Sequence, residues 1–206
     1  MFKKVGIILR KNKSISDKDI YSVNQDLILF LNKYENIMTY FFVIDDRTTF
    51  TKLKLFIDEC DGIILPGGDQ SNPYIFELIK YLYIEDKPTL GICLGMQELA
   101  LFCDGKMSKL NTTHHQTNKT YAHEVLIDEN STLYQIIGKK KIIVNSRHND
   151  YISYTKANRL AYSNDYIIEA IEIPNRKCMI GVQWHPESLY FDENSNKLFN
   201  YFIHQL

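Results

Sequence analysis

The segment LGICLGMQ at residues 90–97 places a cysteine between two glycines. This is the pattern of a nucleophile turn, in which a strand passes directly into a helix and flanking side chains would collide. Cys93 is then expected at a helix N-terminus, where the helix dipole favours the thiolate. The backbone N–H of Leu94 points to the same spot and can stabilise an oxyanion. The segment predicts nucleophilic catalysis; the alternative is a small buried cysteine in a glycine-rich turn.

A base for such a thiolate is offered by GVQWHPES at residues 181–188. His185 ends an apolar strand, because Pro186 cannot donate to a sheet ladder. Residues two apart in an extended chain point to the same side. Glu187 is therefore expected to fix the tautomer of His185, as the third member of a catalytic triad does. The alternative is a surface histidine at the end of a strand.

Two glycines follow another apolar strand in LPGGDQSNP, residues 65–73. Because glycine has no Cβ, the backbone N–H groups of Gly67 and Gly68 can approach a substrate closely. We expect Gly68 to supply the second oxyanion donor. No G-K-[ST] follows, so the segment is not a Walker phosphate loop. An ordinary turn is the alternative.

The histidine pattern does not predict a metal site. His114 and His115 are adjacent, so in a strand they face opposite ways, and no partner stands at metal-ligand spacing. We therefore expect no metal ligands in this chain.

The elements around these motifs alternate between strand and helix. Apolar runs typical of buried strands occupy residues 3–9, 38–44, 62–65 and 88–93. Helical patterns occupy residues 50–60, 72–86, 94–103 and 195–206. Ser16 is expected to cap a further helix that reaches Tyr34, since Ile20, Val23 and Leu27 begin an apolar face at helical spacing.

This alternation predicts an α/β fold with a mostly parallel central sheet flanked by helices. Ligands bind such sheets at the carboxyl ends of the strands, where the three motifs lie. After residue 110 the strand candidates are closely spaced, at residues 123–127, 141–146, 159–163, 166–173 and 178–184. They predict a smaller antiparallel sheet in the C-terminal half.

Composition limits the classes of partner and the location. The chain has 206 residues, 45% of them apolar, and a formal net charge of -1. It has no basic footprint for nucleic acid or an anionic membrane, and Arg10 interrupts the first apolar run too early for a signal peptide. No run reaches the roughly 20 apolar residues of a membrane span. We expect a cytoplasmic protein whose four cysteines, none in a C-x-x-C pair, are free thiols.

Together, the segments PGG (66–68), GICLGMQ (91–97) and GVQWHPE (181–187) resemble the glutaminase motifs of class I glutamine amidotransferases, in the same order. The stretch that contains HEVLI, VNSRHND and LAYSNDYIIEAIE resembles the γ-glutamyl hydrolase branch of that family. The resemblance implies one class I glutamine amidotransferase-like domain over residues 1–206. It also implies a Cys93–His185–Glu187 triad and an oxyanion hole from Gly68 and Leu94.

The same resemblance implies the substrate-binding residues. Gln97 would hold the γ-glutamyl group beside Gly67, and Asn145, Arg147 and His148 would line the opposite wall, largely through backbone groups. The branch usually has a small or apolar residue after VNS, where this chain has Arg147.

The implied reaction is hydrolysis of a γ-glutamyl amide through a thioester on Cys93, with release of glutamate and no metal or organic cofactor. Two other hypotheses compete with a free-standing hydrolase. One is the glutaminase subunit of a two-chain amidotransferase that feeds ammonia to a synthase partner. The other is a non-catalytic binding protein of the same fold. The hydrolase-like C-terminal half favours the hydrolase, and the presence of all three triad residues disfavours the binding protein.

Arg147 bears on the leaving group of this hydrolase. Its charge is permanent and its fork suits carboxylate or phosphate. An anionic leaving group is therefore expected, such as that of γ-glutamyl-CDP-amidate, a nucleotide phosphoramidate that one member of the branch cleaves. The alternative is that Arg147 contributes only its backbone and points to solvent.

Overall fold

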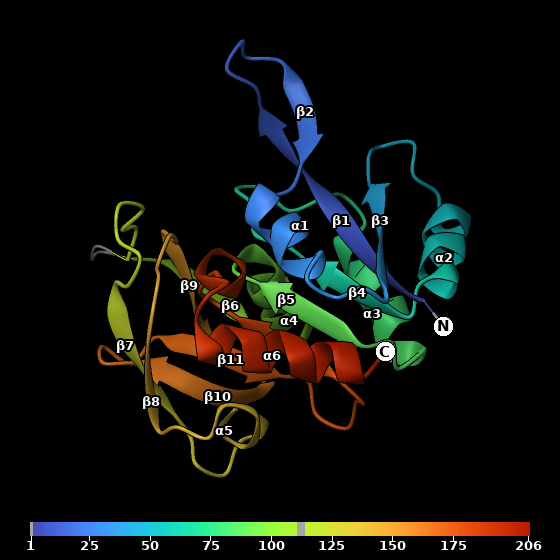
Figure 1. Cartoon of the computed structure of the whole chain (residues 1–206). Helices are drawn as coiled ribbons and strands as arrows, with labels where there is room; N and C mark the ends of the chain where they lie inside the picture. The colour runs from blue at the N-terminus through green and yellow to red at the C-terminus, as the bar shows by residue number, and fades with distance from the viewer. Residues whose placement is uncertain (1, 111–113) are drawn as a thin grey trace.

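A computed structural model describes residues 2–110 and 114–206. A ten-stranded sheet runs through the molecule with helices on both of its faces (Figure 1). Its parallel part has the order β3-β1-β4-β5-β12. These strands are β1 (Lys3–Lys13), β3 (Ile37–Val43), β4 (Gly62–Leu65), β5 (Thr89–Ile92) and β12 (Met179–Val182).

The same sheet continues beyond β12 with antiparallel pairing in the order β12-β11-β10-β7-β8. The added strands are β11 (Ile168–Glu172), β10 (Asn158–Ser163), β7 (His123–Ile127) and β8 (Lys141–Val144). The separate small antiparallel sheet consists of β6 (Lys106–Lys109) and β9 (Asp150–Tyr154). The predicted α/β class is confirmed, but most C-terminal strands extend the central sheet.

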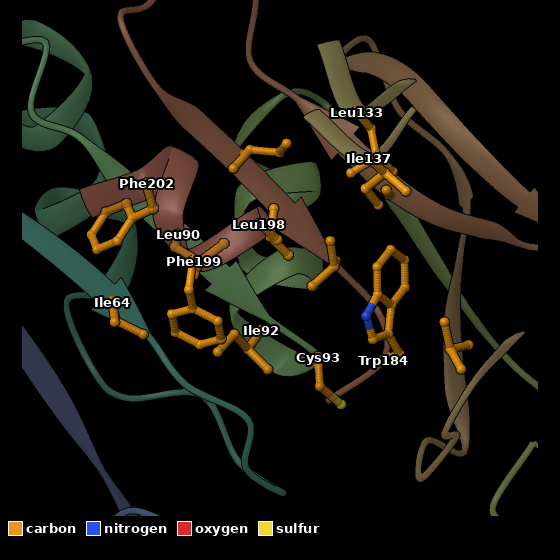
Figure 2. Packing of buried hydrophobic residues seen from close by; sticks show 14 of the residues in the cluster. Ile64, Leu90, Ile92, Cys93, Leu133, Ile137, Trp184, Leu198, Phe199 and Phe202 are labelled. Atoms are coloured by element: carbon orange, nitrogen blue, oxygen red, sulfur yellow. The ribbon is translucent and has the colours of Figure 1, made fainter. Parts of the chain in front are cut away.

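Apolar side chains leave the strands on both faces and build two cores. One face is covered by α1 (Gln25–Leu31), α5 (Thr132–Ile137) and α6 (Glu193–His204). The other is covered by α2 (Phe50–Glu59), α3 (Ile75–Ile84) and α4 (Leu94–Phe102). Figure 2 shows Phe199 and Phe202 of α6 packed over the first face, close to Ile64 of β4 and Leu90 of β5. Strands buried on both faces explain the near-continuous apolar runs of the sequence.

The predicted helix between Ser16 and Tyr34 is wrong in its first half. Residues Asp19–Ser22 form β2, which pairs antiparallel with residues 10–13 of β1 in a hairpin that projects from the sheet (Figure 1). The helix starts only after Asn24, whose side chain accepts a hydrogen bond from the N–H of Asp26 at 3.1 Å. Strand pairing with the extended end of β1 competes with the helical pattern there, and Asn24 is a strong N-cap.

No helix in residues 2–110 and 114–206 is long and apolar enough to cross a membrane.

Candidate active site

The turn that carries Cys93 joins β5 to α4, and β5 lies between β4 and β12 in the parallel part of the sheet. Cys93 has φ 51° and ψ -104°, in the positive-φ region that non-glycine residues rarely occupy. Such a backbone costs on the order of 1–3 kcal/mol and persists where its surroundings fix it. Two hydrogen bonds fix it here: the Cys93 N–H donates to Val182 O at 2.8 Å, and the Gln97 N–H donates to Cys93 O at 3.1 Å.

The two glycines around Cys93 are required by space. A Cβ on Gly95 would lie 2.0 Å from the carbonyl oxygen of Leu65, and a Cβ on Gly91 would lie 2.7 Å from the carbonyl carbon of Gly95. The crowding expected from the sequence pattern is therefore present. Because neither glycine has a Cβ, the turn can lie directly against β4.

His185 and Glu187 follow the end of β12. The Nδ1 of His185 lies 2.7 Å from Oε1 of Glu187. A Cβ on Gly67 would lie 2.7 Å from Cε1 of His185 and 3.5 Å from Cβ of Cys93, so both side chains lie against the backbone of Gly67. The extended geometry expected for His185–Glu187 is wrong, because Pro186–Leu189 form a single 3-10 turn, η1, that carries Glu187 back to the ring.

The surroundings of His185 favour the imidazolium. Burial alone lowers the pKa of His185, but the charge of Glu187 and hydrogen bonding with the Cys93 thiol and Glu187 outweigh it and raise this pKa to about 10. An imidazolium beside a thiol stabilises the thiolate, which is the nucleophilic form of cysteine.

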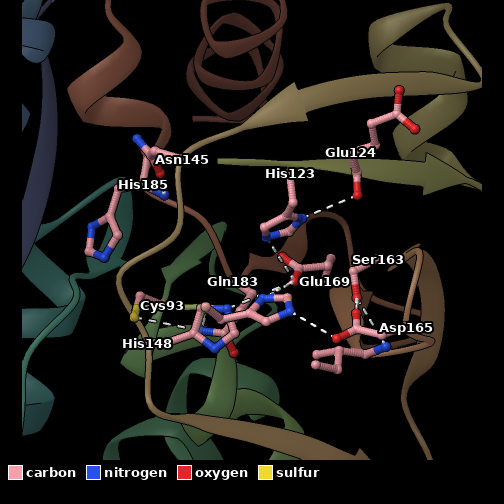
Figure 3. Close-up of polar contacts among 12 residues, drawn as sticks. Cys93, His123, Glu124, Asn145, His148, Ser163, Asp165, Glu169, Gln183 and His185 are labelled. Carbon is pink, nitrogen blue, oxygen red and sulfur yellow. Dashed lines mark hydrogen bonds and ion pairs between the residues drawn. The ribbon is translucent and has the colours of Figure 1, made fainter. Parts of the chain in front are cut away.

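Three amide side chains hold these residues in place, and Figure 3 shows two of them, Asn145 and Gln183. Asn145 makes two hydrogen bonds of 2.8 Å with the backbone of His185, one as donor and one as acceptor. Gln183 Nε2 lies 3.5 Å from the Cys93 sulfur. Gln97 donates to Gln183 Oε1 at 3.1 Å and to Asp150 O at 3.0 Å.

A cavity of about 450 Å³ opens in front of Cys93. Of the residues that the sequence assigned to the site, Gly68, Leu94, Gln97, Arg147 and His148 line this cavity together with Cys93. Gly67 and Asn145 instead contact His185.

Arg147 is half-buried in the cavity wall. Its Nη1 donates to Ser188 Oγ at 3.1 Å, and Ser188 Oγ in turn donates to Asp26 at 2.6 Å. It is the one arginine or lysine among the described residues that line the cavity, where Asp69, Glu98 and Asp150 also lie.

Arg10 was not predicted as a site residue, yet it supports the loop after β4. It is fully buried, pairs with Glu98 at 2.7 and 2.8 Å, and donates to Pro66 O at 2.9 and 3.0 Å. A Cβ on Gly68 would lie 2.8 Å from the Arg10 side chain. A charged residue inside the apolar run of β1 was the one available sequence signal.

A second missed group lies behind the cavity wall. The ligand atoms of His114, His123, His148 and Glu169 all lie within 4.8 Å of one another. Burial raises the pKa of Glu169 to about 8 and lowers that of His148 to about 4. These residues come from four separate segments, so no local spacing indicated them.

Known proteins match this chain in sequence and in fold. Residues 72–187, more than half of the chain and including Cys93, His185 and Glu187, match the peptidase C26 family. The chain belongs to the peptidase C26 family. It is therefore a hydrolase of glutamine amidotransferase-like type.

Several relatives are described as amidotransferases or synthases. The chain is 31% identical over 182 residues to the CTP synthase of Borreliella burgdorferi, covering 69% of this chain and 34% of that protein. It is 27% identical over 220 residues to the putative glutamine amidotransferase-like protein YvdE of Lactococcus lactis, covering 89% and 85%. The chain thus spans about a third of the length of the CTP synthases that it matches, with 36% and 34% of two of them covered.

Solved structures show the same fold. A putative GMP synthase subunit from Thermoplasma acidophilum superposes with a TM-score of 0.74 at 19% identity, covering 100% of this chain and 94% of the other. A glutamine amidotransferase from Methylobacillus flagellatus gives a TM-score of 0.64 at 19% identity, covering 91% and 71%.

Proposed function

We propose that the chain hydrolyses a γ-glutamyl amide with Cys93 as nucleophile. The observation that carries this proposal is the strained Cys93 turn at a cavity, with His185 hydrogen-bonded to Glu187 at 2.7 Å and both Cys93 and His185 packed against Gly67. A thiol, an imidazole and an orienting carboxylate form the constellation of nucleophilic acyl transfer.

In this mechanism the Cys93 thiolate attacks the γ-carbonyl carbon. The backbone N–H groups of Gly68 and Leu94, which both line the cavity, stabilise the oxyanion of the tetrahedral intermediate. His185 gives its proton to the departing nitrogen, and the thioester forms. His185 then takes a proton from water, which attacks the thioester; glutamate is released, and the Cys93 thiolate and the protonated His185 are restored.

The charge of the cavity bears on the leaving group. Glu98 is neutralised by Arg10, which leaves Asp69 and Asp150 as acids and Arg147 as the fixed cation of the lining. A γ-glutamyl group carries its own α-ammonium and α-carboxylate, so the acids suit the ammonium. We assign Arg147 to a negative leaving group, preferably one that bears phosphate, such as γ-glutamyl-CDP-amidate.

The test is a panel of γ-glutamyl amides with anionic, neutral and cationic leaving groups, and free glutamate is measured. We expect turnover by the purified chain, fastest for the anionic member, and no turnover by Cys93→Ala with an unchanged circular dichroism spectrum. Glutamate release by well-folded Cys93→Ala would contradict the mechanism. Preference for a cationic amide would contradict the assignment of Arg147.

A glutaminase role within a two-chain enzyme is the second candidate function, and the matches to CTP synthases and to a GMP synthase subunit favour it. In that function, glutamine is the substrate, ammonia is the product, and a synthase partner receives it. The same panel separates the two candidates. A chain that cleaves only glutamine, and does so only after a synthase protein is added, has the glutaminase function.

A further inference from the structure

Behind the cavity wall, three histidines and one glutamate converge on a point that no part of the proposed reaction uses. His114 precedes a single bridge between His115 and Arg147, His123 begins β7, His148 lies in the loop before β9, and Glu169 lies in β11. Figure 3 shows His123 and His148 directed toward Glu169. The Glu169 Oε1 atom lies 3.5 Å from His123 Nε2, 3.8 Å from His114 Nδ1 and 3.9 Å from His148 Nε2.

In each ring, the outer nitrogen is the one that points away from Glu169, and the inner nitrogen is the one that lies near it. The hydrogen bond of the outer nitrogen fixes the tautomer of the ring. His114 Nε2 lies 3.0 Å from Asp165 Oδ2, His123 Nδ1 lies 3.1 Å from Glu124 O, and His148 Nδ1 lies 2.9 Å from Asp150 O. Carbonyl and carboxylate oxygens only accept hydrogen bonds. The outer nitrogens therefore carry the protons, and the inner nitrogens present lone pairs to one another.

The inner atoms have no hydrogen-bond partner among the described residues. They are His114 Nδ1, His123 Nε2, His148 Nε2 and both carboxylate oxygens of Glu169. The side chains of Glu169 and His148 are only 0% and 2% exposed. Buried polar side-chain atoms nearly always have a hydrogen-bond partner. Five unpartnered atoms gathered at one point therefore indicate a place for a bound ion.

We propose that His114, His123, His148 and Glu169 bind one divalent transition-metal ion, with Zn²⁺ as the best match. Imidazole and carboxylate are zinc ligands, and structural zinc sites take four protein ligands in tetrahedral arrangement. Ligand atoms of such a site lie about 3.4 Å apart when the bonds are about 2.1 Å long. The three Glu169 distances need to contract by about half an ångström or less.

The hydrogen bonds made by the outer ring nitrogens are also those expected at a metal site. Histidines that bind metals almost always donate their other N–H to a carboxylate or a backbone carbonyl, and all three do so here. The hydroxyl of Ser163 donates in turn to Asp165 at 2.5 Å, which holds the partner of His114 in place.

The proposed ion connects the cavity wall, through His148, to the central sheet, through Glu169 of β11. His148 lines the cavity, and the Asp150 carbonyl that accepts from it also accepts from Gln97. With four protein ligands, the ion has no open position for substrate. Its function is to position the segment of residues 147–150 relative to β7 and β11.

Metal content of tag-free protein is the first test. Protein from zinc-supplemented culture should carry one Zn²⁺ per chain by mass spectrometry, and His123→Gln and Glu169→Gln should lose it. His204→Gln is the matched control, because His204 is exposed on α6, and it should keep one equivalent. Cys93→Ala should also keep it, since the ion is not held by Cys93 and His185. Equal zinc in wild type and His123→Gln would overturn the proposal, as would loss in Cys93→Ala alone.

Two further measurements do not require that a protein with a replaced metal ligand still folds. Asp165→Asn changes a half-exposed carboxylate and should weaken zinc binding by about 10–100-fold. Wild type reconstituted with Co²⁺ should give the intense visible absorption of four-coordinate cobalt without a thiolate charge-transfer band. A weak six-coordinate spectrum, or apo protein whose melting temperature does not rise with Zn²⁺ or Co²⁺, would overturn the site.

Discussion

Among the contacts that raise the pKa of His185, the largest effect is that of Glu187. Burial alone lowers the pKa of His185, and the carboxylate and the Cys93 thiol raise it to about 10. Removing the negative charge of Glu187 while keeping its shape therefore leaves the burial effect opposed only by the smaller effects of Cys93 and of the remaining hydrogen bond. The pKa of His185 in Glu187→Gln should fall well below that of wild type.

This shift has a consequence for stability with a definite sign. Because the folded pKa of His185 is raised from 6.5 to about 10, its stabilisation is complete below pH 6.5 and is lost as the pH rises toward 10. The free energy of unfolding of wild type minus that of Glu187→Gln should shrink across this range, measured by urea denaturation. A difference that is constant with pH would contradict the assignment.

The loss of kcat should differ between variants of His185 and Glu187. His185→Ala removes the proton carrier, whereas Glu187→Gln removes only its orientation and charge. We expect Glu187→Gln to lower kcat less than His185→Ala does, measured as glutamate release near pH 7. The reverse ranking would show that Glu187 does more than orient the ring.

Arg147 allows a prediction about selectivity. A charge-assisted contact contributes about 1.5–3 kcal/mol, or about ten- to a hundredfold in kcat/KM. Arg147→Ala should lose that preference for an anionic leaving group and keep slow cleavage of neutral γ-glutamyl amides. Arg159→Ala, an exposed residue of β10, is the control and should change neither. Equal loss on all substrates would place Arg147 at the glutamyl half.

At the scale of elements, the loop after β4 and helix α4 are tied together by a buried ion pair. Arg10 of β1 and Glu98 of α4 are each 1% exposed as side chains, and Ser71 and Asn72 complete their hydrogen bonds. Arg10 also donates to the carbonyl of Pro66, two residues before the proposed oxyanion donor Gly68. The pair thus links the strand, the loop and the nucleophile helix.

Breaking this pair should be expensive. Arg10→Met leaves Glu98 buried without its counter-charge and should cost about 3–5 kcal/mol, measured by chemical denaturation. Arg47→Met removes an exposed arginine paired with Asp45 and should cost about 0–1 kcal/mol. Arg10→Met/Glu98→Met should recover part of the loss. If Arg10→Met and Arg47→Met cost the same, the pair does not stabilise the loop.

The elements also show what sequence could and could not predict. The nucleophile turn is local, because Gly91, Cys93 and Gly95 lie within five residues, and its strand–turn–helix context could be recognised. Arg10 and Glu98 are 88 positions apart, so the charge inside the apolar run of β1 gives no indication of its partner. The β2 hairpin was missed because its pairing depends on how far β1 extends, which a local helical pattern does not show.

The histidine cluster is the strongest example of a non-local site. The expectation that the chain has no metal ligands rests on strand alternation at His114 and His115 and on the lack of a partner at metal-ligand spacing. His114 meets His123 and His148, with ring centroids 4.6 and 5.0 Å apart, because all three lie beside Glu169 of β11. Spacing along the sequence can identify metal ligands that lie on one turn or one hairpin. The four residues of this cluster come together only through the order of strands in the sheet, which local spacing does not show.

At the scale of the whole molecule, the question is whether the chain works alone. The cavity, Cys93, His185 and Glu187 are all supplied by this chain. Purified protein should therefore hydrolyse its preferred γ-glutamyl amide unaided, measured as glutamate release at a rate that is linear in protein concentration. Inactivity on the whole panel until a synthase is added would contradict this and favour the glutaminase function.

The position of β12 in the sheet has a consequence for the order in which the chain can fold. Residues 179–182 insert between β5 and β11, so two earlier strands keep open edges during synthesis until this late segment is made. Long-range strand pairing is intrinsically slow, and open edges invite pairing with other chains. A nascent chain released before β12 would expose the unpaired edges of β5 and β11 and would lack His185. Its dependence on chaperones should therefore be greatest at that length.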